Sequence, residues 1–151
     1  MSLQFDFTKP VAVGCDHAGF EYKMAIVKHL NSMGYQVEDN GTYSADSVDY
    51  PDFAHPVAKS IESGTAAFGI LICGSANGVA MTANKHAGIR AAICWQKDVA
   101  AVTRQHNNAN IICIPARYVS EQNAMEMIDV FMATPFEGGR HQNRINKITC
   151  S

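Results

Sequence analysis

The chain alternates between short apolar segments and longer segments in which apolar residues recur every three or four positions. Short apolar segments bounded by turn residues predict buried strands, whereas the recurring pattern predicts amphipathic helices. Five strands are therefore expected, over residues 11–15, 35–38, 68–73, 89–94 and 111–114. Because strands that alternate with helices form βαβ units, we predict an α/β fold whose five-stranded parallel sheet is covered on both faces.

Apolar stripes predict the helices between these strands. The first stripe consists of Phe20, Met24, Val27 and Leu30, and Gly34 follows it as a helix stop. Polar capping residues and a proline then mark where later helices begin. The expected signals are Asp49 and Pro51 with the face Phe53, Val57 and Ile61; a small-residue helix over 79–85; Asp98 before a helix that runs to His106; and Ser120 with the face Ala124, Met127, Ile128 and Phe131.

The composition fits a single domain, residues 1–151, with a basic tail from about residue 138. Apolar residues make up 47% of the 151 positions and charged residues 17%, which supplies a core and argues against disorder. The formal net charge is −2, so the chain has no basic field that would attract nucleic acid. Small anions would have to be held by a local cluster of residues.

The cysteines and the apolar segments indicate a compartment. Five cysteines, an odd number, occur without a C-x-x-C pair, so a disulfide framework is not expected and a reducing cytosol fits better. Residues 1–10 contain no long apolar stretch of the kind found in signal peptides, and no segment approaches the ~18 apolar residues of a membrane span. We therefore expect a soluble, cytoplasmic protein.

Ligands of parallel sheets bind beyond the carboxyl ends of the strands, so the residues that follow each strand are candidates for the site. The first such turn, 14–19, has Asp16 where a dinucleotide-binding fingerprint has its middle glycine, although Asp39 stands where an acidic ribose anchor would. A carboxylate there would repel a pyrophosphate. Asp16 and His17 suit sugar hydroxyls and proton transfer; the alternative is a helix-capping aspartate beside a surface histidine.

The loop 73–78 follows the most apolar strand and leads into a helix. Its small residues allow backbone N–H groups to face an anion, and the helix N-terminus adds positive potential. It is neither a Walker loop nor a nucleophile elbow, because G-K-[ST] and G-x-S-x-G are absent. Cys73 could act there as a thiolate base beside an oxyanion-binding loop; the alternative is a buried strand-end cysteine next to a tight turn.

Two further candidates lie toward the C-terminus. His106 falls near a helix end and is followed by Asn107, a second polar group for the same ligand, although a lone histidine is more often structural. Arg140 and Arg144 share one helix face, which makes either a phosphate clamp or a solvated basic tail. The six histidines are scattered without an H-x-x-x-H pair, so no metal site is expected.

Six motifs occur in order along the chain. They are G-C-D-H-A-G-F at 14–20, D-Y-P at 49–51, I-L-I-C-G-S-A-N-G at 70–78, A-N-K-x-x-G-I-R at 83–90, R-Q-H-N at 104–107 and E-G-G-R-H-Q-N-R at 137–144. Over residues 11–148 the chain resembles the type B ribose-5-phosphate isomerase family and its relatives that isomerise 6-phospho-sugars. The resemblance implies a Rossmann-like three-layer α/β/α fold, no metal or organic cofactor, and a homodimer or tetramer with active sites shared between subunits, which the basic tail would reach.

The same resemblance implies a reaction and its residues. The reaction is the interconversion of D-ribose 5-phosphate and D-ribulose 5-phosphate through a cis-enediolate after ring opening, a step of the pentose phosphate pathway. Catalysis would use Cys73 as the base between C1 and C2, Ser75 at the sugar oxygens, His106 for ring opening, and Asp16 as its helper. The implied substrate contacts are His17, Tyr50, Gly74, Ser75, Ala76, Asn77, Gly78, Asn107, Arg117, Arg140 and Arg144.

Two positions depart from the family pattern. Many relatives have glycine at Ala76, so a positive φ there would strain the loop. One branch of the family lacks the cysteine and uses a glutamate directly after the last loop glycine; here that residue is Val79 and Cys73 is present, which indicates the cysteine-base branch. Three alternatives stay open, namely an allose or galactose 6-phosphate isomerase, a non-catalytic partner subunit of one, and a nucleotide-binding domain.

Overall fold

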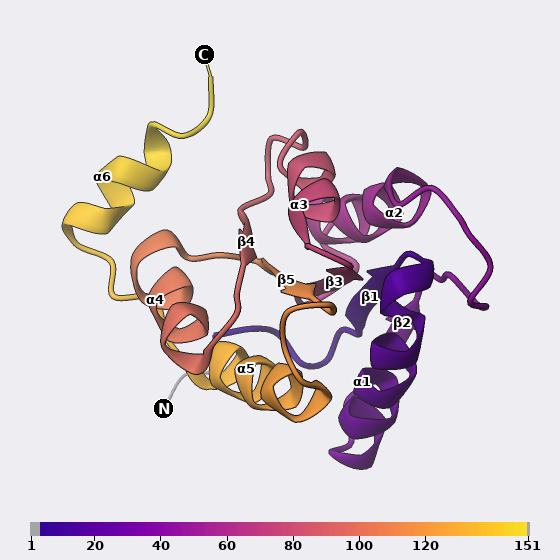
Figure 1. Cartoon of the computed structure of the whole chain (residues 1–151). Coiled ribbons are helices and arrows are strands. Elements are labelled where there is room, and N and C mark those ends of the chain that lie inside the picture. The colour runs from indigo at the N-terminus through magenta and orange to yellow at the C-terminus, as the bar shows by residue number, and fades with distance from the viewer. Residues whose placement is uncertain (1–3, 151) are drawn as a thin grey trace.

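The computed structural model describes residues 4–150, so residues 1–3 of the segment examined for a signal peptide and Ser151 of the basic tail lie outside it. Its centre is a five-stranded parallel sheet in the order β2-β1-β3-β5-β4 (Figure 1). The chain reverses its direction across the sheet between β1 and β3, the position where such folds bind ligands. The strands are β1 (Val11–Cys15), β2 (Val37–Asp39), β3 (Gly69–Cys73), β4 (Ala91–Ile93) and β5 (Ile111–Pro115).

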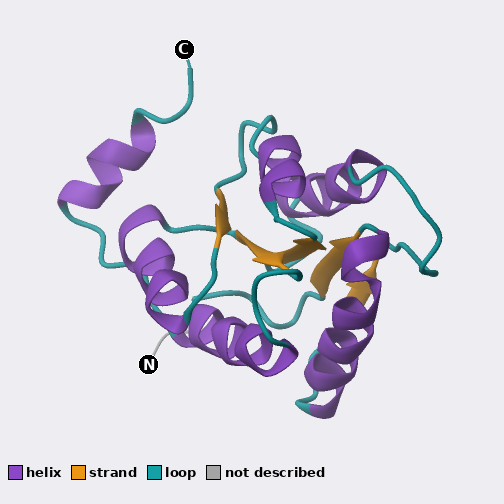
Figure 2. Cartoon of the chain, in the orientation of Figure 1, coloured by secondary structure: helices purple, strands orange, loops and turns teal. Residues whose placement is uncertain are grey.

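Helices cover both faces of the sheet. Figure 2 shows α2 and α3 on one face and α1, α4 and α5 on the other, while α6 packs against α4. This is the predicted three-layer α/β/α arrangement. The helices are α1 (Phe20–Ser32), α2 (Pro51–Glu62), α3 (Asn77–Ala83), α4 (Lys97–Asn107), α5 (Glu121–Ala133) and α6 (Arg140–Asn146), and the short 3-10 helix η1 (His17–Gly19) precedes α1.

The central strands send alternate side chains into two apolar clusters. Val13, Ile70 and Ile112 pack toward α1, α4 and α5, whereas Leu71 and Cys113 pack toward α2 and α3. Both faces of these strands are therefore covered, and every residue of β1, β3 and β5 is buried. Strands buried on both faces appear in a sequence as continuous apolar segments, which is why the pattern predicted these three well.

The predicted buried face of α1 is only partly right, because Phe20 and Leu30 pack in the core but Met24 does not. Met24 is 57% exposed, and the buried residues of α1 are Lys23, Ile26 and Leu30. The helix is rotated relative to the prediction because the Lys23 ammonium forms an ion pair with Asp39 at 2.6 Å, which places a charged side chain inside the fold. A pattern of apolar residues cannot predict a buried lysine in a helix when its charged partner lies on a strand.

Element boundaries also differ from the predictions. The second and fourth strands are shorter than expected, and α3 begins two residues earlier. The predicted cap at Ser120 is confirmed, because its hydroxyl accepts a hydrogen bond from the Asn123 amide at 3.0 Å. The caps predicted at Asp49 and Asp98 are wrong, since Tyr50 and Gln96 occupy the N-cap positions without a side-chain bond (Pro51 does open α2). Between residues 4 and 150, no helix combines the length and apolar character that crossing a membrane requires.

Candidate active site

A cavity of about 310 Å³ opens at the carboxyl ends of β1, β3 and β5. It collects most of the residues predicted for the strand-end site, and it adds Ala18 and Tyr118, which the sequence analysis did not single out. A hollow of about 570 Å³ beside α3 and β4 is larger, but Lys85 is the only titratable side chain in its lining. The smaller cavity is lined by Asp16, His17, Ala18, Tyr50, Cys73, Gly74, Ser75, Gly78, Arg117 and Tyr118.

Cys73 is the last residue of β3 and only 4% of it is exposed. Its carbonyl accepts a hydrogen bond from the Ala116 amide at 2.9 Å, and the Gly74 carbonyl accepts one from the Arg117 amide at 3.0 Å. These two bonds join the end of β3 to the loop after β5. The thiol is therefore held at the cavity by backbone on two adjacent strands.

Arg117 brings a positive charge to the same loop. A Cβ atom added at Gly74 would lie 3.1 Å from the Arg117 Nε and 3.2 Å from its Cζ, so a larger residue would push the guanidinium away by a few tenths of an ångström. A guanidinium can bind a phosphate or carboxylate through two parallel hydrogen bonds. Glycine at position 74 thus serves the approach of Arg117, a reason that the sequence alone did not reveal.

The loop after Cys73 has free backbone donors. Within residues 4–150, the amides of Gly74, Ser75 and Ala76 donate no hydrogen bond to another protein group, and the Ser75 hydroxyl accepts one from the Asn77 amide at 3.3 Å. Free N–H groups at a strand end can stabilise a negative oxygen that forms during a reaction. Ala76 has a φ of 65° and is fully buried, so the strain considered for this position is present.

Tyr50 packs against the last glycine of this loop. A Cβ atom at Gly78 would lie 2.5 Å from the Tyr50 Cζ, so the aromatic ring requires glycine there. Tyr50 itself is 40% exposed, and it forms part of the cavity wall as predicted. The D-Y-P motif and the C-G-S-A-N-G motif are therefore neighbours in space.

Asp16 and His17 line the same cavity. Asp16 caps η1, since its Oδ1 accepts hydrogen bonds from the Ala18 amide at 3.0 Å and the Gly19 amide at 3.2 Å. The capping alternative for Asp16 is thus correct, and Oδ2 stays available to a ligand. The His17 Nδ1 accepts a hydrogen bond from the Val48 amide at 3.2 Å, which leaves Nε2 as the donor nitrogen.

Three other thiols are buried away from the cavity. Burial raises the pKa of Cys15 to about 11 and that of Cys94 to about 12, and it raises the pKa of Cys113 well above its ordinary value. Each of the three therefore stays protonated near neutral pH, and a protonated thiol is a poor base. None of the three lines the cavity.

The other predicted residues lie at the opposite edge of the sheet. His106 and Asn107 end α4, and the Arg90 side chain, directly before β4, donates from Nε to the carbonyls of Asn107 at 3.0 Å and Asn108 at 3.1 Å. The end of α4 is thus at the amino ends of the strands, whereas Cys73 ends β3. One chain does not bring His106 to the cavity. Asn107, Arg140 and Arg144 share this location, because α6 packs on α4 (Figure 1).

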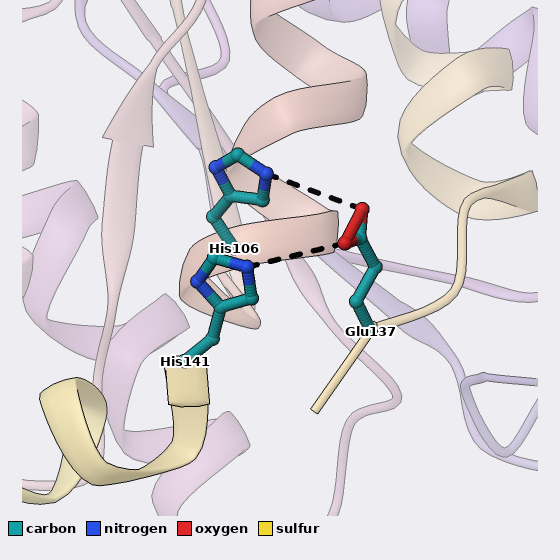
Figure 3. A group of neighbouring side chains, drawn as sticks. All are labelled: His106, Glu137 and His141. Carbon is teal, nitrogen blue, oxygen red and sulfur yellow. Dashed lines mark ion pairs between the residues drawn. The ribbon is translucent and has the colours of Figure 1, made fainter. Parts of the chain in front are cut away.

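Two residues without a predicted role surround His106. Figure 3 shows the Glu137 carboxylate beside the two stacked imidazoles, with Oε1 4.0 Å from the His106 Nε2 and Oε2 3.9 Å from the His141 Nε2. Among the described residues these three form the one group with the donors of a metal site, and their donor atoms lie within 4.8 Å of one another. The rings are parallel, with an interplanar angle of 13°, so their Nε2 lone pairs do not converge as tetrahedral coordination requires.

Comparisons with known proteins identify the family. Residues 11–148 match the Ribose/Galactose Isomerase family. Ribose-5-phosphate isomerase B of Escherichia coli is 43% identical over 141 residues, which are 93% of this chain and 95% of that protein. The corresponding enzyme of Thermotoga maritima has 48% identity and a TM-score of 0.92, over 93% of this chain and 97% of that one.

A further relative carries a bound sugar phosphate. The Mycoplasma genitalium ribose-5-phosphate isomerase B, solved with bound ribulose-5-phosphate, is 41% identical, covers 95% of each chain and has a TM-score of 0.89. Sequence identity and coverage agree in all three comparisons, and the fold agrees in the two solved structures, as the order of the six motifs predicted. The chain belongs to the Ribose/Galactose Isomerase family.

Proposed function

We propose that this protein is an aldose–ketose isomerase that interconverts ribose 5-phosphate and ribulose 5-phosphate. The observation that carries the proposal is the position of Cys73 at the wall of the strand-end cavity, beside free backbone donors and the Arg117 guanidinium. A base, an oxyanion-binding loop and an anion-binding side chain are the three things that a sugar-phosphate isomerase needs in one place. A cavity of about 310 Å³ suits a small phosphorylated sugar.

Cys73 is the proton-transferring base in this proposal. The thiolate removes the proton from C2 of the open-chain aldose, the electron pair moves to form the C1–C2 double bond, and the carbonyl oxygen O1 becomes negative. The amides of the loop hold this oxygen in the cis-enediolate, and the Ser75 hydroxyl moves a proton between O2 and O1. The proton on Cys73 then returns to C1, which yields the ketose.

The absence of a second base at the loop supports the cysteine-base branch. Val79, directly after the last loop glycine, is fully buried in the apolar cluster under α3. A carboxylate at that position would have served as the alternative base. Within this loop the thiol of Cys73 is therefore the group suited to the proton transfer.

A second copy of the chain completes the site in this proposal. His17 and Arg117 line the cavity, whereas His106, Arg140 and Arg144 lie at the far edge of the sheet of the same chain. Arg140 and Arg144 are exposed, as expected for a clamp that acts on a neighbouring subunit. The assembly is a homodimer, or a tetramer of two such dimers, in which each tail supplies the phosphate clamp of the partner's cavity.

Ring opening assigns roles to His106 and Asp16. Ribose 5-phosphate is largely cyclic, so an enediolate cannot form until the C1 aldehyde is exposed. His106 from the second subunit transfers the proton between O1 and O4, Asn107 contacts the sugar, and the free Oδ2 of Asp16 assists from the cavity wall.

Two observations weaken the alternatives. Asp39, the residue that would anchor a nucleotide ribose, is already paired with Lys23 at 2.6 Å, and its Oδ1 also accepts the Gly41 amide at 2.9 Å. A non-catalytic partner subunit would not need base, oxyanion loop and clamp in one chain. A 6-phospho-sugar isomerase shares all of these groups, so the substrate assay below distinguishes it.

The test is a side-by-side assay of the purified chain on ribose 5-phosphate and allose 6-phosphate. We expect turnover of ribose 5-phosphate with kcat in the ordinary range of about 1–10³ s⁻¹. Allose 6-phosphate should have a lower kcat/KM, because one additional carbon must fit between the catalytic loop and the clamp. Turnover of allose 6-phosphate alone would contradict the proposed substrate. If the purified protein converted neither sugar phosphate, the proposal that this chain is active without a different partner subunit would be wrong.

A further inference from the structure

The surroundings of His106 are built by two elements that meet at the end of α4. The Glu137 amide donates a hydrogen bond to the Gln105 carbonyl at 3.0 Å, which fixes the start of the tail beside His106. Figure 3 shows that Glu137 and His141 both approach His106 from this tail. The contact is therefore part of how α6 docks on α4, and it does not depend on one flexible side chain.

A buried arginine stabilises the same junction through hydrogen bonds. Arg104 is 1% exposed, and its guanidinium donates to the Asn108 Oδ1 at 2.9 Å, to the Ala109 carbonyl at 2.5 Å and to the Thr134 carbonyl at 3.3 Å. It thereby connects the last turn of α4 with the segment that leads to the tail. Burial, together with the charge of Arg90, lowers the pKa of Arg104 to about 10, so it stays charged at neutral pH.

The imidazole of His106 has one partner on its face and one at its edge. The His141 ring stacks on it with centroids 4.3 Å apart, and the Glu137 carboxylate lies at the Nε2 edge of both rings. Burial, with the nearby His106, lowers the pKa of His141, so His141 is neutral at neutral pH and adds no positive charge against His106. The stack restricts the ring plane, and the carboxylate favours one direction within that plane.

His106, Glu137 and His141 differ in exposure, as expected if the other two hold the His106 ring in place and the three do not form part of the core. His106 is 44% exposed and Glu137 50%, whereas the supporting His141 ring is 10% exposed. An exposed carboxylate and imidazole that serve only stability contribute little, about 0–1 kcal/mol. A role in stability therefore does not explain why a hydrogen-bonded junction aligns these two side chains. A role in orienting an imidazole that acts on a ligand does explain it.

We propose that Glu137 is a positioning residue for His106, and that it orients the imidazole for the proton transfers that open the sugar ring. This inference rests on the proposed isomerase function. Ring opening removes the proton from the O1 hydroxyl, breaks the C1–O4 bond, forms the C1 aldehyde and leaves a proton on O4. His106 accepts the first proton and delivers one to O4, and the neighbouring carboxylate orients the imidazole for both transfers.

Ring opening at His106 and proton transfer at Cys73 occur in different halves of the proposed site, so they can be measured separately. Ribulose 5-phosphate has no hydroxyl that can close a five- or six-membered ring on its C2 carbonyl, so it is open-chain. Exchange of its C1 hydrogen with solvent passes through the enediolate and needs the base of the cavity, but it does not need ring opening. A residue that acts through His106 should therefore slow the isomerisation of ribose 5-phosphate, which needs ring opening. It should leave the hydrogen exchange of ribulose 5-phosphate unchanged.

The experiment compares Glu137→Gln with the wild-type protein in both reactions. With ribose 5-phosphate we expect kcat to fall about tenfold with KM within about twofold, a part of the 10²–10⁴-fold that a positioned acid–base group contributes. With ribulose 5-phosphate in deuterium oxide, loss of the C1 proton signal by NMR should proceed at the wild-type rate. Glu126→Gln is the matched control, since Glu126 is an exposed carboxylate paired with Lys97 at 3.7 Å on the surface, and both rates should be unchanged.

The outcomes distinguish the inference from the function beneath it. Equal kcat of Glu137→Gln and wild type on ribose 5-phosphate would overturn the positioning role, and so would an equal loss in both reactions, because that indicates a structural effect. Failure of the wild-type protein itself to exchange the C1 hydrogen of ribulose 5-phosphate would instead refute the proposed isomerase.

Discussion

The two halves of the proposed site differ in how the fold holds them. Cys73 is 4% exposed at the end of a fully buried strand, and hydrogen bonds from the neighbouring loop fix it. His106 is 44% exposed at a helix end, and Arg140 and Arg144 project from the seven-residue helix α6. The proposed base is thus carried by a fully buried strand and the proposed phosphate clamp by a short peripheral helix. One copy of the chain therefore contains all of the residues proposed for the reaction, but it does not bring them to one place.

Removal of the base should give the largest effect. We expect Cys73→Ala to lose about 10³-fold or more in kcat, because no other group in the loop can take the C2 proton. The measurement is the initial rate on ribose 5-phosphate together with a circular dichroism spectrum to verify the fold. Cys150→Ala is the control, since Cys150 is an exposed thiol outside the cavity. A Cys73→Ala protein that keeps its turnover would remove Cys73 from the mechanism.

Loss of one clamp arginine should have a smaller effect of another kind. Arg140→Ala should raise KM about 10- to 100-fold, which corresponds to a charged hydrogen bond of about 1.5–3 kcal/mol, with little change in kcat. Lys147→Ala, a cation that follows α6 on the same tail, should change neither constant by more than about twofold. If Arg140→Ala lowered only kcat, the clamp interpretation of the tail would be wrong.

The strained loop residue should give the smallest effect. Ala76 lies at a φ of 65°, which costs an L-residue about 1–2 kcal/mol, so Ala76→Gly should raise the free energy of unfolding by about 0.5–1 kcal/mol after the extra chain entropy of glycine is counted. Ala80→Gly, in the middle of α3, should lower it by about 1 kcal/mol. Urea unfolding of the two variants is the measurement. A lower stability of Ala76→Gly would mean that the loop is not strained at this position.

Much of the fold was predictable because its central strands are buried on both faces. Their continuous apolar segments and the helical stripes gave the sheet and its covering layers, and the capping role of Ser120 was found correctly. The rotation of α1 was missed because it depends on the pairing of Lys23 with Asp39, two residues far apart in the sequence. The boundaries of β2 and β4 were missed because these edge strands are only partly buried.

The residues that line the cavity could be proposed one by one from the motifs, but their arrangement in space could not. The motifs pointed to Cys73 and to Arg140 and Arg144, yet no spacing says that the cysteine and these two arginines lie at opposite edges of one sheet. Glu137 and His141 were visible as part of a motif, and their i, i+4 spacing is a signal that could have been used. What the sequence could not show is that Glu137 returns to the end of α4, since that contact depends on how the tail docks.

The most direct test of a site completed by a second copy uses mixed dimers. A Cys73→Ala chain and an Arg140→Ala/Arg144→Ala chain, each with its own affinity tag, are co-expressed, and the dimers that carry both tags are isolated. Each mixed dimer has one cavity with an intact base and an intact partner tail, and one cavity that lacks both. We predict that it regains about half of the wild-type turnover at low ribose 5-phosphate concentration, although both parent proteins are nearly inactive. Activity no higher than the mean of the two parents would contradict the shared site.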